Sequence, residues 1–294
     1  MRSVFPRGSR LSSRLSTRAS SARRLSTHAS SCYLPTEWTE LPLLTKTAVS
    51  HDTDRYDFGL PDKTPLALPV CACILMQTPE GDVRPYTPIS DDSQLGSFTL
   101  LVKRYAQGKA AQYLHALEPG ARVRFKHIAQ NVKEQYPFEG KNSISMLCAG
   151  TGVTPIYQAL RKILTTPGDD REVNVLVGNK SVDDILLLDE LTKMADTYAD
   201  RFNLLHVIGE RPDEPYDEDI ARRLGAERYE SGWIDEEKIQ AHCFPRSRHY
   251  DSLILVCGLP AMYEALCGPR ADKELAPVSV LGRLGYSTEE VAKM

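Results

Sequence analysis

The stretch "SISMLCAGTGVTPIYQALRKILTT" (143–166) changes character at its centre. Residues 143–150 are largely apolar and predict a buried strand, while Thr154–Thr166 carry apolar side chains at the spacing of an amphipathic helix. The junction, Gly150-Thr151-Gly152, contains the glycines that a tight turn requires. A buried strand that turns directly into a helix is the building unit of an α/β fold.

The same unit recurs downstream. We expect strands at "EVNVLVGN" (172–179), "NLLHVIGE" (203–210) and "DSLILVCG" (251–258). Helices are expected at "SVDDILLLDELTKMADTYADRF" (181–202), "DEEKIQAHC" (235–243) and "PAMYEAL" (260–266). This alternation predicts an α/β doubly wound parallel sheet over residues 143–294.

The pattern upstream is different. Alternating polar and apolar residues predict strands at 38–60, 68–79, 96–105 and 121–128, with one helix at "GKAAQYLHAL" (108–117). Short strands separated by turns predict a small antiparallel β-barrel over residues 36–128. The polar segment 129–142 is then the linker between two domains.

The N-terminal segment, residues 1–35, holds seven arginines and no acidic residue. An Arg-rich, Ser-rich, acid-poor composition predicts a targeting leader, and a mitochondrial leader is favoured over a plastid one. The alternative is a disordered basic tail with no targeting function. The remaining 29 basic and 39 acidic residues leave a net charge of about −10, which argues against nucleic-acid binding. No later stretch has the roughly 18 apolar residues of a membrane span.

The seven cysteines form an odd set without the spacing of a disulfide framework. Cys71 and Cys73 are separated by one residue, which is too close for common zinc or iron–sulfur motifs. We therefore expect free thiols, a reducing compartment and no metal site.

Three short motifs carry candidate chemistry. In "VRPYTPIS" (83–90), the Arg84 guanidinium can bind a phosphate through two hydrogen bonds, and the Tyr86 ring can stack on a planar cofactor. The alternative is an edge strand with a surface arginine and a packed tyrosine. "CAGTGVTP" (148–155) offers a dinucleotide site at a helix N-terminus or a simple tight turn. "LILVCGLPAMYEAL" (253–266) puts Cys257 at the carboxyl end of a strand, as a ligand contact or as a buried structural thiol.

Taken together, the order and spacing of these motifs resemble the ferredoxin–NADP reductase superfamily. With "GKAAQYL" and "DDILL" included, the chain is more narrowly similar to the NADH–cytochrome b5 reductase family, from Thr47 to the C-terminus. The last segment, "VLGRLGYSTEEVAKM" (280–294), resembles the tail of the mitochondrial form of plants and fungi. This agrees with a mitochondrial leader.

The resemblance implies two cofactor sites. FAD would be held by Arg84, Pro85, Tyr86, Thr87, Leu101, Lys103, Tyr105, Gly108, Lys109, Ala110, Ala111 and Thr154. NADH would be held by Gly150, Thr151, Gly152, Pro155, Cys257, Gly258, Pro260 and Met262. Cys257, Thr87 and Lys103 would lie closest to the reaction, with Lys103 stabilising the anionic reduced flavin.

The implied reaction passes a hydride from NADH to FAD and then single electrons to a one-electron acceptor. Residues 101–126 carry six cations against one acidic residue, Glu118. This asymmetry predicts a basic face for cytochrome b5 or a similar acidic haem protein; the alternative is an ordinary solvated strand face with cofactor ligands.

Some positions depart from the family pattern. Ala111 stands where serine is usual, Leu259 replaces a proline, and Met294 replaces a terminal phenylalanine. The acidic residue that selects NADH falls near Gly209, with Glu210 beside it. Two alternatives stay open: a reductase on the same scaffold that serves another acceptor and, because of Ala111 and Leu259, a non-catalytic interaction module that kept the fold.

Overall fold

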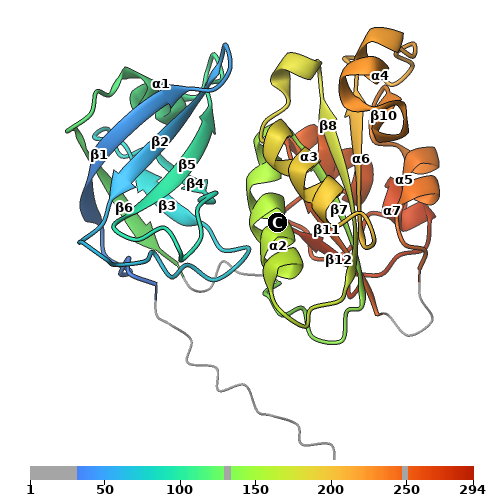
Figure 1. Ribbon diagram of the computed structural model, residues 1–294, viewed down its shortest axis with the longest axis horizontal. Helices are drawn as coiled ribbons and strands as arrows, with labels where there is room; N and C mark the ends of the chain where they lie inside the picture. Colours follow the sequence, from blue (N-terminus) through green and yellow to red (C-terminus); the bar gives the residue numbers. More distant parts are fainter. Residues whose placement is uncertain (1–31, 129–133, 247–250) are drawn as a thin grey trace, which may run out of the picture. The chain divides into compact units, whose positions relative to one another are not determined.

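The computed structural model describes residues 32–128, 134–246 and 251–294, and within them the strands form two six-stranded sheets (Figure 1). The first sheet is antiparallel. It contains β1 (Thr39–Ala48), β2 (Thr53–Gly59), β3 (Ile74–Gln77), β4 (Val83–Tyr86), β5 (Ser97–Lys103) and β6 (Arg122–His127). The strand order is β4-β3-β6-β1-β2-β5, so β4 and β5 are the two edges.

The segment after β4 brings these two edges together. The N–H of Ile89 donates to the carbonyl of Thr99 on β5 at 2.9 Å, and the N–H of Thr99 donates to Oγ of Ser90 at 2.9 Å. These bonds close the sheet on itself and confirm the expected antiparallel barrel. The edge position of β4 also explains how a strand containing Pro85 is tolerated.

The interior of the barrel is aromatic. Phe58, Phe98 and Phe125 are fully buried, and the ring of Phe125 meets the other two edge-on at 4.7 and 5.4 Å between centroids. Helix α1 (Lys109–Ala116) contributes Ala110, Ala111 and Leu114 to the same core. Burial of these side chains therefore fixes α1 against the barrel.

The second sheet is parallel and has the order β10-β9-β8-β7-β11-β12. Its strands are β7 (Ser143–Ala149), β8 (Glu172–Asn179), β9 (Phe202–Ile208), β10 (Tyr229–Ser231), β11 (Ser252–Cys257) and β12 (Val291–Lys293). The helices are α2 (Val153–Thr165), α3 (Leu188–Thr197), α4 (Glu218–Leu224), α5 (Glu236–His242), α6 (Pro260–Cys267) and α7 (Val280–Arg283). The expected doubly wound parallel sheet is confirmed.

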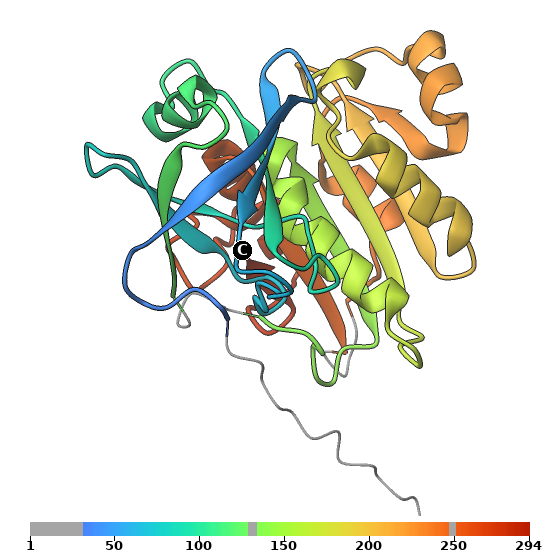
Figure 2. The ribbon, with the colours of Figure 1, turned by 60° about the vertical axis from the view of Figure 1, so that its left-hand side comes forward.

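Helices cover both faces of this sheet. On one face, sheet residues such as Met146 and Val175 pack with Ile156 of α2 and Leu191 of α3, and Figure 2 shows these two helices along the sheet. On the other face, Leu147 and its neighbours pack with residues of α5, α6 and α7. Because both faces are buried, these strands read as continuous apolar runs.

Several predicted boundaries were wrong. The strand expected at 68–79 begins at Ile74, because Ala67 and Cys71 adopt positive φ values of 51° and 68° that no strand accommodates. The helix expected at 181–202 divides into a 3-10 turn (Val182–Asp184) and α3, since Leu187 is left-handed at φ 59°. The short elements α4, β10, α7 and β12 were not expected.

Residues 1–31 of the predicted leader and 129–133 of the predicted linker lie outside the described residues. In the part of the chain that is described, no helix combines the length and the apolar composition needed to cross a membrane.

Candidate functional site

The two glycine motifs of the parallel sheet meet at neighbouring strand ends. Cys148 on β7 is directly paired with Cys257 on β11, so the Gly150–Gly152 turn and Gly258 leave the sheet side by side. A Cβ on Gly152 would lie 2.2 Å from the carbonyl oxygen of Cys257. Glycine at 152 therefore lets the start of α2 approach β11. This contact lies at the carboxyl ends of the strands, where α/β proteins bind ligands.

A pocket of about 290 Å³ lies at these strand ends. Its wall combines Gly150 after β7, Gly209 after β9 and Met262 of α6 with Lys103 and Tyr105 at the end of β5. The hydroxyl of Tyr105 reaches within 3.9 Å of the Cβ position of Gly150. The pocket is thus lined by residues from both the parallel sheet and the barrel.

Cys257 ends β11, two residues before Leu259 of the pocket wall; it is half-buried and has Tyr263 as a hydrogen-bond partner. Burial raises the pKa of its thiol, and the Tyr263 hydrogen bond and Arg270 charge offset that effect in part. The thiol is therefore protonated at neutral pH, which fits a contact residue and does not fit a nucleophile. All seven cysteines are free thiols.

The residues of "VRPYTPIS" occupy the β4 edge of the barrel. Arg84 and Pro85 are exposed, and the Arg84 guanidinium donates to the carbonyl of Val83 at 2.7 Å. Tyr86 and Thr87 are half-buried, and burial raises the pKa of Tyr86 to about 12, with the Arg84 charge acting in the opposite direction. Tyr86 remains a neutral phenol that can present its ring or donate a hydrogen bond.

Helix α1 begins close to this edge. Lys109 Nζ lies 4.0 Å from Oδ2 of Asp82, the residue just before β4. Gly108 at the N-cap has no side chain to cap the helix, and the first N–H groups of a helix have no intrahelical acceptor. Lys109 is exposed, whereas Ala110 and Ala111 face the barrel core.

Leu101 and Lys103 of β5 and Tyr105, two residues after it, lie in different surroundings. Leu101 is buried among residues of α2 and the parallel sheet, and Tyr105 is exposed at the pocket. Thr154 is buried in the first turn of α2, and its hydroxyl donates to the carbonyl of Thr151 at 3.1 Å. Pro155 is buried beside it.

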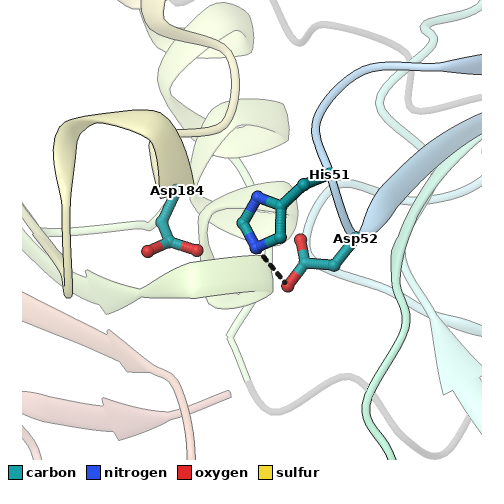
Figure 3. Close-up of side chains that lie close together, drawn as sticks. All are labelled: His51, Asp52 and Asp184. Carbon is teal, nitrogen blue, oxygen red and sulfur yellow. Dashed lines mark ion pairs between the residues drawn. The ribbon is translucent and has the colours of Figure 1, made fainter.

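Lys103 is held by two carboxylates that the sequence did not indicate. Its Nζ lies 2.7 Å from Oδ1 of Asp184, in the 3-10 turn after β8, and 3.1 Å from Oδ2 of Asp52, in the β1–β2 loop. In the view of Figure 3, the Asp52 and Asp184 carboxylates lie on either side of the His51 ring, whose Nε2 is 3.5 Å from Oδ2 of Asp52. The side chains of Lys103, Asp52 and Asp184 are 14–20% exposed.

The electrostatics of this cluster favour the charged forms. Burial is the largest single effect and raises the pKa of each carboxyl group, but the Lys103 hydrogen bond, the Lys103 charge and the hydroxyl hydrogen bonds together outweigh it and leave the pKa of Asp52 and Asp184 below the usual value. Burial lowers the pKa of Lys103, and the two carboxylates raise it above the usual value. His51, Asp52 and Asp184 form a possible ligand set for a metal, but a lysine ammonium is already bound to both carboxylates.

A second, more polar pocket of about 640 Å³ adjoins Gly209. Glu210 and Arg211 line it, and both are exposed, together with Tyr216. Glu210 is thus available to a ligand that extends past the end of β9.

Comparisons with known proteins agree with this geometry. Residues 40–132 match the family model for the oxidoreductase FAD-binding domain, and residues 146–268 match that for the oxidoreductase NAD-binding domain. These two matches coincide with the barrel and with the parallel sheet.

Two named relatives align with most of the chain. NADH-cytochrome b5 reductase 2 of Saccharomyces cerevisiae is 37% identical over 87% of this chain and 83% of its own length. The protein of the same name from Aspergillus terreus is 34% identical over 87% of this chain and 78% of its own length.

Solved structures show the same fold. The cytochrome b5 reductase domain of Ulva prolifera nitrate reductase is 27% identical, with a TM-score of 0.72, over 88% of this chain and 98% of that domain. A ferredoxin NADP+ reductase of Neisseria gonorrhoeae shares the fold at a TM-score of 0.62 and 14% identity, over 87% of this chain and 98% of that one. The chain belongs to the NADH–cytochrome b5 reductase family, within the ferredoxin–NADP reductase superfamily.

Proposed function

We propose that this protein is an NADH-dependent flavoprotein that reduces cytochrome b5 or a similar acidic haem protein. The observation that carries the proposal is the shared pocket, in which the strand ends of the NAD-binding part meet Lys103 and Tyr105 of the FAD-binding part. A pocket lined by both parts is what a direct transfer between two cofactors requires.

The residues at the β4 edge fit FAD. Arg84 is exposed on β4, and Lys109 at the start of α1 lies 4.0 Å from Asp82, just before β4. A guanidinium together with the free N–H groups of an uncapped helix start suits a pyrophosphate. Arg84, Lys109 and the N–H groups of Ala110 and Ala111 would hold the pyrophosphate. Gly108, whose own N–H donates to the carbonyl of Tyr105 at 2.9 Å, would form the turn that lets the phosphate approach the helix. Tyr86, Pro85, Thr87 and Leu101 would hold the ring system, with Thr154 reaching it from α2.

The strand ends of the parallel sheet fit a nicotinamide nucleotide. The Gly150–Gly152 turn and Pro155 would bind its phosphates at the start of α2, and Cys257, Gly258, Pro260 and Met262 would place the nicotinamide. Glu210, exposed in the adjoining polar pocket, would accept the ribose hydroxyls and repel a 2′-phosphate. This preference favours NADH over NADPH.

Bound FAD supplies the chemistry, since it accepts a hydride and returns electrons one at a time. The protein orients and shields the reacting groups. Tyr105, Gly150 and Met262 line the pocket, and Cys257, just before its wall, is a neutral thiol and not a nucleophile.

The test begins with the absorption spectrum of the purified full-length protein. We expect a yellow protein with flavin bands that NADH bleaches and NADPH bleaches much more slowly, and that then reduces ferricyanide and cytochrome b5. A colourless protein that cannot be reconstituted with FAD would overturn the proposal. Bleaching by NADH without reduction of cytochrome b5 would leave a reductase that serves another acceptor.

We propose that the partner docks on exposed cations near β5 and α1, chiefly Arg104 and Lys109. Arg122 and Arg124 also belong to the expected basic face, but both extend toward Glu40, at 3.6 and 3.4 Å. Reduction of cytochrome b5 should therefore fall more in Arg104→Glu than in Arg124→Glu, while ferricyanide reduction stays unchanged in both. Equal loss in the two variants would argue against this surface.

We further propose that residues 1–35 direct the protein to mitochondria, that 129–142 link the FAD-binding part (36–128) to the NAD-binding part (143–294), and that the protein itself needs no metal. The Arg-rich, acid-free composition of the leader supports the first point. Fusion of residues 1–35 to a fluorescent protein tests it, and a diffuse cytosolic signal would contradict it.

A further inference from the structure

Lys103 connects the two parts of the molecule through charge. It ends β5 of the barrel and is paired in register with Thr53 of β2. Its 2.7 Å contact with Asp184 reaches the turn that follows β8 of the parallel sheet. Lys103 and Asp184 also both line the nucleotide pocket, so their ion pair forms part of its wall.

Both carboxylates are oriented before they meet the lysine. Asp52 accepts hydrogen bonds from the hydroxyls of Ser50 and Thr53, each at 3.1 Å, through its other oxygen. Asp184 accepts from the hydroxyl of Ser181 at 2.8 Å, also through its other oxygen. Two preoriented acceptors on one ammonium fix the lysine side chain in a single position.

We propose that Asp52 and Asp184 are positioning residues that hold Lys103 as a bridge between the barrel and the parallel sheet. The bridge sets the wall of the pocket, and so the alignment of the nucleotide with the flavin. The inference rests on the proposed function, because it assumes that NADH occupies this pocket.

The bridge and the role that the family resemblance implies for Lys103 predict opposite effects of Asp184→Asn on the rate of hydride transfer. If Lys103 acts as a positive charge on the flavin, Asp184 weakens that charge, and Asp184→Asn should accelerate hydride transfer while Lys103→Met slows it. If Lys103 acts as a bridge, loss of either partner breaks the same contact. Both substitutions should then slow hydride transfer, and their effects should not add.

The experiment is stopped-flow bleaching of the flavin by NADH, with full-length protein that has been confirmed to hold FAD. At saturating NADH, we expect the rate to fall about tenfold in Lys103→Met and in Asp184→Asn, since small misalignments cost rate steeply. The double variant should be no slower than the slower single variant. Asp52→Asn should give a smaller loss of about threefold, because Asp184 still holds the lysine.

Asp183→Asn is the matched control. Asp183 lies in the same 3-10 turn, but its side chain is 77% exposed and pairs with Arg223 at 3.3 Å. We expect the wild-type rate in this variant. Melting temperature and FAD content, measured for every variant, separate loss of alignment from loss of folding.

Three results would overturn the bridge: faster bleaching in Asp184→Asn, an unchanged rate in that variant, or additive losses in the double variant. The proposed function fails separately, because in that case wild-type protein would hold no FAD or would not be bleached by NADH.

Discussion

Nδ1 of His115, in the last turn of α1, lies 2.7 Å from Oδ2 of Asp54 on β2. Asp54 is buried, and the hydroxyl of the fully buried Tyr56 donates to the same oxygen at 3.1 Å. The ammonium of Lys46 donates to the carbonyl of His115. This polar network ties the C-terminal end of α1 to the barrel. The first turn of the same helix is the one that we assign to the FAD pyrophosphate.

Asp54→Ala should destabilise the protein by about 2 kcal/mol, because the Tyr56 hydroxyl would remain buried without its acceptor. His115→Ala should cost about 1 kcal/mol, since its side chain is 39% exposed and solvent screens the pair. Urea unfolding measures both. Thr45→Val removes an exposed hydrogen bond to Asp57 in the same barrel and should change stability by less than about 0.5 kcal/mol. Equal effects in the three variants would contradict the role of the network.

Gly152→Ala should disrupt the nucleotide site. The new Cβ would lie 2.2 Å from the Cys257 carbonyl oxygen and 2.6 Å from its carbon, and both are backbone atoms that cannot rotate away. We expect a loss of about 2 to 3 kcal/mol in unfolding free energy and strongly weakened NADH binding. Gly178→Ala is the control for stability, because its Cβ would meet its nearest neighbour at 3.6 Å. Gly178 also lines the pocket, so NADH binding is compared with the wild type alone. A Gly152→Ala protein of normal stability would show that α2 can move away from β11.

Arg84→Ala should release FAD. A charged hydrogen bond to phosphate contributes about 1.5 to 3 kcal/mol, which predicts a Kd for FAD that is higher by a factor of ten or more. Equilibrium dialysis or fluorescence of released FAD measures it. Arg124→Ala, on β6 and paired with Glu40, should retain FAD as the wild type does. Normal retention in Arg84→Ala would refute the assigned role.

The pH dependence of stability should carry a contribution from His206. Its side chain is 1% exposed, and neither ring nitrogen has a hydrogen-bond partner among the described residues. Burial, with a smaller effect of Arg228, lowers the pKa of His206 to about 4. The unfolded chain therefore binds the proton more readily between about pH 6.5 and pH 4, so stability is full above that window and falls as the pH drops through it.

The fall should amount to about 3 kcal/mol over the window, at most. His206→Leu removes the titrating group, and its unfolding free energy should depend less steeply on pH between 6.5 and 4. Parallel curves for the variant and the wild type would contradict a buried neutral histidine.

Patterns within a single element were the part of the structure that the sequence predicted well. β7, α2 and β11 followed from their apolar runs, and the motifs at their ends lie side by side because neighbouring parallel strands have their carboxyl ends on the same side of the sheet. β10, β12 and α7 were missed because three or four residues are too few to show a period. The positive φ of Cys71 was missed because cysteine, unlike glycine or asparagine, is not a residue type that favours this conformation.

Contacts between distant segments were also out of reach. Lys103 was identified as a site residue, but its partner Asp184 is 81 positions away in the chain. "DDILL" was noticed for its family resemblance, and its second aspartate turned out to hold the lysine. Charge pairs of this kind depend on the packing of whole elements, which short-range patterns do not encode.

The apolar core of the parallel sheet has a consequence for anyone who dissects this protein. Leu101, Ile89 and Cys71 of the FAD-binding part are buried in the same cluster as Val153 and Tyr157 of α2, and the N–H of Cys71 donates to Gln158 of that helix at 2.7 Å. A fragment cut after residue 142 would expose this apolar surface to water on both pieces. Expressed alone, the separated pieces should therefore aggregate, and co-expression should rescue their solubility.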